Sequence, residues 1–424
     1  MGKNDPAIMR PLRVLCCSGS LDGGGSERQL WQLASKLDRR QFAPSVYLLY
    51  RRGHYIEQLP SDVNVAAFWD HYDERRWFTP GEIRRTQIAH LAVLILEHQI
   101  DVVYDRTFHM TLVTAAAAAR ARVPRVSVIV SPPSADFQRS RERFRFFKKR
   151  ILAKAYRQSG CVTIAVSEEV ADDAAAFYRL DRKNIVVLPN PVDVAAVRSA
   201  ANESVFLTGA TSFTNQPSTN QHKGQLRIAV VGRLSGEKGQ RLALEALKIA
   251  NAGRVEPIKL ELVGDGPDRD SLEALTTELG LREHVTFHGF LPNPYPLIRA
   301  SNLVCIPSEY EGLPNVALEA MVLETGLVAT NCSGSLRTLI GNNSSASVSD
   351  AIQWGERGAL VAPGNAKALA DVFCSLETER DAWLRRTAAA KRWVESQHAI
   401  ESWLEEMSKL LSGLACKRHF KLGS

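Results

Sequence analysis

The stretch Pro307-Ser308-Glu309-Tyr310-Glu311-Gly312-Leu313-Pro314-Asn315-Val316-Ala317-Leu318-Glu319-Ala320-Met321 joins a short apolar run to a segment with helical character. The apolar run, residues 303–306, ends in a polar loop that holds Glu311, and Pro314 stands where a helix can begin. Glu319 then falls about two turns inside that helix. The stretch therefore predicts one carboxylate in a loop after a strand and a second carboxylate held on a helix.

This loop and helix have the groups that would bind an activated sugar. The first N–H groups of a helix lack intrahelical partners and attract anions, so those of Gly312, Asn315 and Val316 can hold a diphosphate. Glu311 can accept hydrogen bonds from sugar hydroxyls, and Glu319 can accept those of a ribose diol. The alternative is an ordinary helix begun by proline, with one solvated glutamate and one capping glutamate.

A second phosphate-binding segment is predicted upstream. The apolar run 226–231 is followed by Gly232-Arg233-Leu234-Ser235-Gly236-Glu237-Lys238-Gly239 and then by a helical pattern. Glycines after a strand let the backbone approach a phosphate closely, and Arg233 and Lys238 can contact its oxygens as a planar fork and as a point charge. Taken alone, the two basic residues are better explained as ordinary surface charges.

Several other motifs occur in a fixed order around these two segments. They are Gly23-Gly24-Gly25-Ser26-Glu27-Arg28, Ile185-Val186-Val187-Leu188-Pro189-Asn190-Pro191-Val192-Asp193, Leu262-Val263-Gly264-Asp265-Gly266-Pro267 and His288-Gly289-Phe290. Together with the segments around Arg233 and Glu311, they resemble the ordered motifs of the retaining glycosyltransferases of family four. The resemblance covers most of residues 12–395.

The resemblance implies an α/β protein with the GT-B fold, in which two Rossmann-like, doubly wound domains face each other across a cleft. It implies a metal-independent hexosyltransferase that moves a hexose or N-acetylhexosamine from a nucleoside-diphosphate sugar to a glycan or lipid-linked acceptor. The sugar nucleotide is a co-substrate, and no cofactor is expected. The implied catalytic residues are Glu311, Arg233 and Lys238. The implied donor-binding residues are Gly24, Gly25, Gly312, Leu313, Pro314, Asn315, Val316 and Glu319.

One departure from the family concerns a histidine that many members carry at the end of a first-domain strand. Val130 or Ser131 stands at that place. Polar residues that could face the cleft instead are Tyr104, Asp105, Arg106 and His109. The missing histidine leaves a binding protein without catalytic activity as an alternative function, and a GT-B sugar-nucleotide epimerase is another. The residues do not identify the sugar, the nucleotide or the acceptor.

The chain alternates strand-like and helix-like segments, which is the pattern of parallel βαβ units. We expect a first domain over residues 1–198, a polar insertion over 199–224 and a second domain over 225–399. A final helix over 400–424 is expected to pack back on the first domain. Strands are expected near residues 12–17, 46–50, 102–104, 126–130, 162–166 and 185–188, and near Ile228, Leu260, Val285, Leu303 and Leu327.

Composition limits the possible partners and location. The formal charge of +7, from 53 basic and 46 acidic residues, favours an anionic partner. Seven scattered cysteines without metal-ligand spacing indicate reduced thiols, and no apolar run approaches the length of a membrane span. We expect a cytoplasmic protein. Residues 137–157 combine basic and aromatic side chains. This segment is therefore either a helix that binds an anionic membrane surface or an ordinary surface helix of the first domain. No nucleic-acid recognition motif accompanies the charge.

Overall fold

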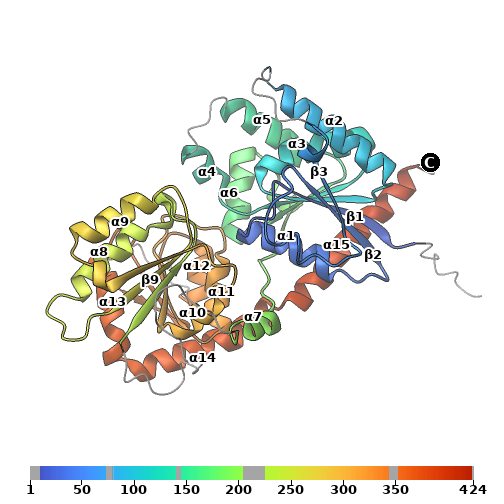
Figure 1. Ribbon diagram of the computed structural model, residues 1–424. Coiled ribbons are helices and arrows are strands. Elements are labelled where there is room, and N and C mark those ends of the chain that lie inside the picture. Colours follow the sequence, from blue (N-terminus) through green and yellow to red (C-terminus); the bar gives the residue numbers. More distant parts are fainter. Residues whose placement is uncertain are drawn as a thin grey trace, which may run out of the picture. The chain divides into compact units, whose positions relative to one another are not determined.

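The computed structural model describes residues 10–72, 79, 81–139, 145–203, 225–342 and 352–422. The chain divides into two compact units (Figure 1). The first unit comprises Met1–Asn190 with Glu401–Ser424, and the second comprises Pro191–Ile400. Each unit is a sheet with helices on both of its faces.

The first unit is built on a seven-stranded parallel sheet with the order β3-β2-β1-β4-β5-β6-β7. The strands that follow β1 are added on one side of it, and those that follow β4 are added on the other side. This is the topology of a doubly wound fold. The strands are β1 (Leu12–Ser18), β2 (Phe42–Leu48), β3 (Asn64–Ala67), β4 (Val102–Arg106), β5 (Arg125–Ile129), β6 (Cys161–Ala165) and β7 (Ile185–Val187).

Helices pack on both faces of this sheet, and most of them connect one strand to the next. They are α1 (Gly25–Lys36), α2 (Glu82–Glu97), α3 (Phe108–Ala121), α4 (Pro133–Arg139), α5 (Arg145–Tyr156), α6 (Glu168–Tyr178) and α15 (Ile400–Leu422), with short 3₁₀ turns η1 (Phe68–Asp70) and η2 (Arg182–Asn184). All residues of β4 and β5 are buried, because helices cover both faces of a parallel sheet. One core cluster packs Leu15, Val103 and Leu91 together.

The second unit repeats this plan with the strand order β10-β9-β8-β11-β12-β14-β13. All pairs are parallel except β13 with β14, which is antiparallel. The strands are β8 (Arg227–Val231), β9 (Lys259–Val263), β10 (Val285–Gly289), β11 (Leu303–Ile306), β12 (Gly326–Thr330), β13 (Gln353–Trp354) and β14 (Ala359–Val361).

The helices of the second unit again cover both faces of the sheet (Figure 1). They are α7 (Val194–Ala200), α8 (Gln240–Ala250), α9 (Arg269–Glu278), α10 (Tyr295–Ala300), α11 (Asn315–Val322), α12 (Gly334–Ile340), α13 (Ala366–Thr378) and α14 (Arg380–Gln397), with η3 (Gly236–Lys238) and η4 (Arg282–His284). A core of buried aliphatic residues packs α8, α9 and α13 against β8 and β9, with Leu244, Leu260 and Phe373 at its centre.

The boundary between the units lies at Asn190, earlier than the predicted end of the first domain at residue 198. The reason is that α7 packs against α10 and α11 of the second unit, and Asn293 Nδ2 donates a hydrogen bond of 2.9 Å to the carbonyl oxygen of Ala200. Most of the predicted polar insertion, residues 204–224, lies outside the described residues. None of the described helices is both long enough and apolar enough to cross a membrane.

Candidate functional site

The predicted site residues of the second unit gather where its strand order reverses. β8 and β11 are neighbours in the sheet, and the chain continues from them into the loops that hold Arg233 and Glu311. In an open parallel sheet, the carboxyl ends of two such strands leave a crevice because their connections run to opposite sides. The two segments predicted from the sequence to bind phosphate and sugar therefore lie at the same switch point.

Close backbone packing brings these two loops together. Gly239 has φ of 67°, and a Cβ atom there would lie 2.0 Å from the carbonyl oxygen of Pro307. Glu309 N donates a hydrogen bond of 2.9 Å to the carbonyl oxygen of Glu237. Any side chain at position 239 would separate the loops, so this glycine is required both by conformation and by space.

Lys238 and Glu311, predicted as separate site residues, form an ion pair. Lys238 Nζ lies 2.7 Å from Glu311 Oε1, and Ser308 Oγ donates a second hydrogen bond of 2.7 Å to the same oxygen. In the part of the chain that the structure describes, Glu311 Oε2 accepts no hydrogen bond. The carboxylate is thus held on one side only, and its other oxygen can accept a hydrogen bond from a ligand. Ser308 was not assigned a role from the sequence, although it lies in the decisive stretch.

Arg233 lies on the same loop as Lys238 but is exposed. Its guanidinium donates no hydrogen bond to any described residue. Nearby Glu237 stays ionised: burial alone would raise its pKa, but the hydrogen bond of 2.5 Å from Ser235 Oγ, its backbone hydrogen bond and the Lys238 and Arg233 charges lower it below its ordinary value. The loop therefore offers one cation already paired and one cation ready to pair with a ligand.

Helix α11 begins at Asn315, directly after Pro314, as the sequence predicts. No side chain caps its N-terminus, so the positive end of the helix is open to an anion. Gly312, Leu313 and Pro314 are buried, whereas Asn315 and Val316 are half-buried.

Glu319 is the fifth residue of α11 and so lies in its second turn, closer to the helix start than the predicted two turns. It is buried and interacts with a neighbouring group of the chain. A ribose diol would therefore have to reach a largely covered carboxylate.

The remaining predicted donor-binding residues, Gly24 and Gly25, belong to the first unit. Both are exposed, Gly24 is the N-cap of α1, and Gly25 is its first residue. A Cβ atom at Gly24 would lie 2.3 Å from Glu27 Oε2, because the Glu27 side chain folds back over the start of the helix. Their role in donor binding stays a prediction.

The polar residues considered in place of the family histidine do not act as one group. Tyr104, Asp105 and Arg106 lie in strand β4 rather than in a loop. Asp105 is fully buried and hydrogen-bonds residues of α3 and β5, so the expectation that it faces a ligand is wrong. Ser131, at the position of the family histidine, donates a hydrogen bond of 2.5 Å to Asp136 Oδ2.

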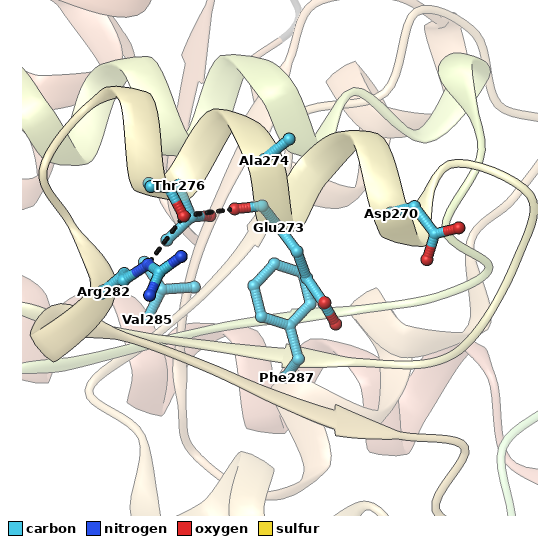
Figure 2. Close-up of a pocket in the computed structure, with 8 residues that line it drawn as sticks. Asp270, Glu273, Ala274, Thr276, Arg282, Val285 and Phe287 are labelled. Atoms are coloured by element: carbon cyan, nitrogen blue, oxygen red, sulfur yellow. Dashed lines mark hydrogen bonds between the residues drawn. The ribbon is translucent and has the colours of Figure 1, made fainter.

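A pocket of about 440 Å³ lies between α9 and β10 (Figure 2). None of the predicted site residues lines it. Two of its charged residues have local hydrogen-bond partners: Arg269 Nε donates to Glu273 Oε1 at 2.9 Å, and Arg282 Nε donates to Thr277 Oγ1 at 2.8 Å. Size alone therefore does not make this pocket the functional site.

Asp268 and Asp270 form an Asp-x-Asp sequence, a pattern used by metal-dependent transferases of another fold. The two side chains lie in different surroundings. Asp270 lines the pocket of Figure 2, whereas Asp268 Oδ2 lies 3.8 Å from the position that a Cβ atom on Gly236 would have. Among the described residues, no three histidine, cysteine, aspartate or glutamate side chains are grouped so that they could hold a metal ion.

Comparison with protein families assigns both halves of the chain. Residues 23–196 match the family model described as Glycosyltransferase Family 4, and residues 212–393 match the model described as Glycosyl transferases group 1. The chain therefore belongs to the family 4 glycosyltransferases, as the ordered motifs predicted.

Individual relatives are similar over part of their length. The 2-deoxystreptamine glucosyltransferase of Streptomyces kanamyceticus is 33% identical over 181 residues, which are 42% of this chain and 44% of that enzyme. The N-acetylgalactosamine-N,N'-diacetylbacillosaminyl-diphospho-undecaprenol 4-alpha-N-acetylgalactosaminyltransferase of Campylobacter jejuni is 27% identical over 41% of this chain and 42% of that enzyme. The matched regions span less than half of these relatives.

Solved structures show the same fold over nearly the whole chain. The crystal structure of Anabaena HepE in complex with UDP-glucose superposes with a TM-score of 0.73 and 21% identity, covering 95% of this chain and 100% of that protein. Likeness at this identity concerns the fold alone. The two Rossmann-like units thus form a GT-B protein, which confirms the predicted fold class.

Proposed function

We propose that this chain transfers a hexose or N-acetylhexosamine, with retention of anomeric configuration and without a metal ion, from a nucleoside-diphosphate sugar to a glycan or lipid-linked acceptor. The proposal rests on one arrangement in the second unit. Three groups belong to segments that meet at the switch point of the sheet. They are the Glu311 carboxylate with one oxygen available, the Arg233 guanidinium, which donates no hydrogen bond to a described residue, and the N-terminus of α11, which no side chain caps.

These groups match the charges that glycosyl transfer develops. The bond between the anomeric carbon and the diphosphate oxygen breaks, and its electron pair leaves with the diphosphate. Arg233, Lys238 and the helix N-terminus stabilise that negative charge. The acceptor oxygen bonds to the same face of the sugar, and its proton passes to the departing phosphate. Glu311 Oε2 orients the sugar by accepting a hydrogen bond from one of its hydroxyls.

The two glutamates should fail in different ways when they are replaced. Glu319→Ala is expected to weaken donor binding, because it removes the acceptor for the ribose hydroxyls. Glu311→Ala is expected mainly to lower turnover, because its partner is the sugar that is transferred. Calorimetric titration with nucleoside diphosphates and steady-state kinetics measure the two effects separately.

Glu319→Gln serves as the control for folding, because it keeps the volume of this buried side chain and one oxygen acceptor. Thermal unfolding should show Glu319→Gln to be closer to the parent than Glu319→Ala. If both alanine variants bind nucleoside diphosphate and turn over donor as the parent does, the roles of these residues are wrong.

We further propose that the first unit meets an anionic membrane surface through α5, where a lipid-linked acceptor would be found. Phe146 and Phe147, at the start of this helix, are 66% and 62% exposed, and Arg150 and Lys154 are exposed beside them. Exposed aromatic and basic side chains on one helix favour the interface of an anionic bilayer. The second half of α5 instead packs into the unit through Leu152 and Tyr156. Residues 140–144, which belong to the segment predicted to bind the membrane, lie outside the described residues.

The membrane proposal predicts salt-sensitive binding to vesicles that contain an anionic lipid. Replacing Phe146 and Phe147 with Ser should reduce co-sedimentation at low salt, and so should Arg150→Gln, because each basic residue near the surface contributes about 1 kcal/mol. Val255→Ser, at a fully exposed position of the second unit, is the control. A parent chain that stays in the supernatant with anionic vesicles at low salt would exclude this surface.

A further inference from the structure

Arg106 carries a buried positive charge that no carboxylate of the described residues pairs with. It is 5% exposed, at the carboxyl end of β4. Its Nη1 and Nη2 atoms donate to neutral groups, Tyr104 Oη at 3.1 Å and Asn190 Oδ1 at 3.3 Å. Its Nε atom is buried and has no hydrogen-bond partner among the described residues. Burying an arginine without an anion is costly, and such residues are normally paired.

The nearest carboxylate along the chain cannot serve as that partner. Asp105 precedes Arg106 in the same strand, so the two side chains point to opposite faces of the sheet. Asp105 is also engaged by Arg125 Nη1 at 3.4 Å and by Ser127 Oγ at 2.8 Å. Arg106 therefore lies on the other face and forms no ion pair with a described residue.

The surroundings of Arg106 are those of a ligand site. β4 and β1 are neighbours at the point where the sheet of the first unit reverses its strand order. The glycine-rich loop after β1 leads into α1, whose N-terminus has no side-chain cap. The residue after Arg106, Thr107, has φ of 70° and ψ of 143°, a strained conformation for a residue with a side chain. Such strain is concentrated at functional sites.

Glu27 is the nearby acid whose charge acts on this site. Burial raises the pKa of its carboxyl, its own backbone N–H and the Arg106 charge lower it, and Asp22 adds to the rise; the net pKa is raised. No ion pair joins Glu27 to Arg106 in the described chain. Glu27 instead folds over Gly24.

We propose that Arg106 binds an oxyanion, a phosphate or carboxylate group, at the switch point of the first unit. A guanidinium forms two parallel hydrogen bonds to such a group, and Nε–H is one of the two donors it uses. The binding of an oxyanion by Arg106 does not depend on the function proposed above. The further step, that this oxyanion is part of the acceptor, rests on that function. The acceptor class would then be one that carries a phosphate or carboxylate beside the hydroxyl that is glycosylated.

Equilibrium dialysis with radiolabelled inorganic phosphate tests the proposal without a donor or any turnover. All proteins carry Arg233→Gln, so that phosphate binding in the second unit is weakened equally in every comparison. We expect saturable binding of phosphate, at least tenfold weaker in Arg106→Met, and a few-fold tighter in Glu27→Gln because the repelling charge is gone. Competition by acetate at matched ionic strength distinguishes a carboxylate site, where acetate displaces phosphate, from a phosphate site, where it does not.

Thermal unfolding of the ligand-free variants separates this role from a structural one. Arg106→Met should leave the midpoint unchanged or raise it, because it removes a buried charge that forms no ion pair with a described residue and nearly keeps the side-chain volume. A clear fall in the midpoint, an absence of saturable phosphate binding in Arg233→Gln, or equal binding in Arg106→Met would overturn the proposal. These outcomes leave the transferase function untouched, since that function is measured by donor turnover.

Discussion

Arg233→Gln is expected to lower the turnover of a nucleoside-diphosphate sugar by about 10²- to 10³-fold, the usual effect of removing one oriented donor from a developing negative charge. The stability of the chain should hardly change. The guanidinium is exposed and donates no hydrogen bond to a described residue, so its removal breaks no hydrogen bond in the described part of the chain. Steady-state kinetics and a thermal unfolding curve on the same preparation test both expectations.

Arg241→Gln is the matched control for this substitution. Arg241 is an exposed arginine at the start of α8, a few residues beyond the segment predicted to bind phosphate. The same loss of charge at Arg241 should reduce turnover by less than twofold if position, rather than net charge, is what matters. Equal losses in the two variants would show that Arg233 contributes only to the overall field of the protein.

Asp105→Ala is expected to destabilise the first unit by about 3–5 kcal/mol, because it leaves Arg125 buried without its anion. Asp105 and Arg125 are 0% and 2% exposed, with Asp105 Oδ2 3.4 Å from Arg125 Nη1. Thr111 Oγ1 and Thr114 Oγ1 also donate to this carboxylate, at 2.6 Å and 2.7 Å. Urea-induced unfolding followed by circular dichroism measures the change in the free energy of unfolding.

Two further variants show whether the cost comes from the unpaired charge. Asp105→Leu combined with Arg125→Met should be less destabilising than Asp105→Ala, because no buried charge is left behind. Asp70→Ala, which removes a partly exposed carboxylate 2.6 Å from Arg51 Nε, should cost less than about 1 kcal/mol. A double variant as unstable as Asp105→Ala would assign the loss to packing instead.

The elements that the sequence predicted are those marked by local pattern. Apolar runs located β1, β8 and β11. Strands β3, β13 and β14 were not predicted, since they have only four, two and three residues. Strands of this length depend on pairing with distant segments, which leaves little trace in their own residues.

The sequence predicted which segments make up the candidate site, but it did not predict which of their side chains form ion pairs. Motif order located the loops of Arg233 and Glu311, because a parallel sheet places loops after its strands at one edge. The pairing of Lys238 with Glu311 joins residues that are 73 positions apart and depends on the close packing at Gly239. Asp105 was misread for a similar reason: a polar residue at the end of a strand resembles a site residue until its partner Arg125 is located.

The proposed reaction is tested most directly by NMR, by following the anomeric signal of each donor in a panel of nucleoside-diphosphate sugars in the presence of EDTA and a simple alcohol as surrogate acceptor. At least one donor should lose its sugar and release its nucleoside diphosphate, and the glycoside formed should have the anomeric configuration of the donor. The reaction should depend on Arg233. If no donor is consumed, if activity appears only when a divalent metal is restored, or if Arg233→Gln is as active as the parent, the proposed reaction is contradicted.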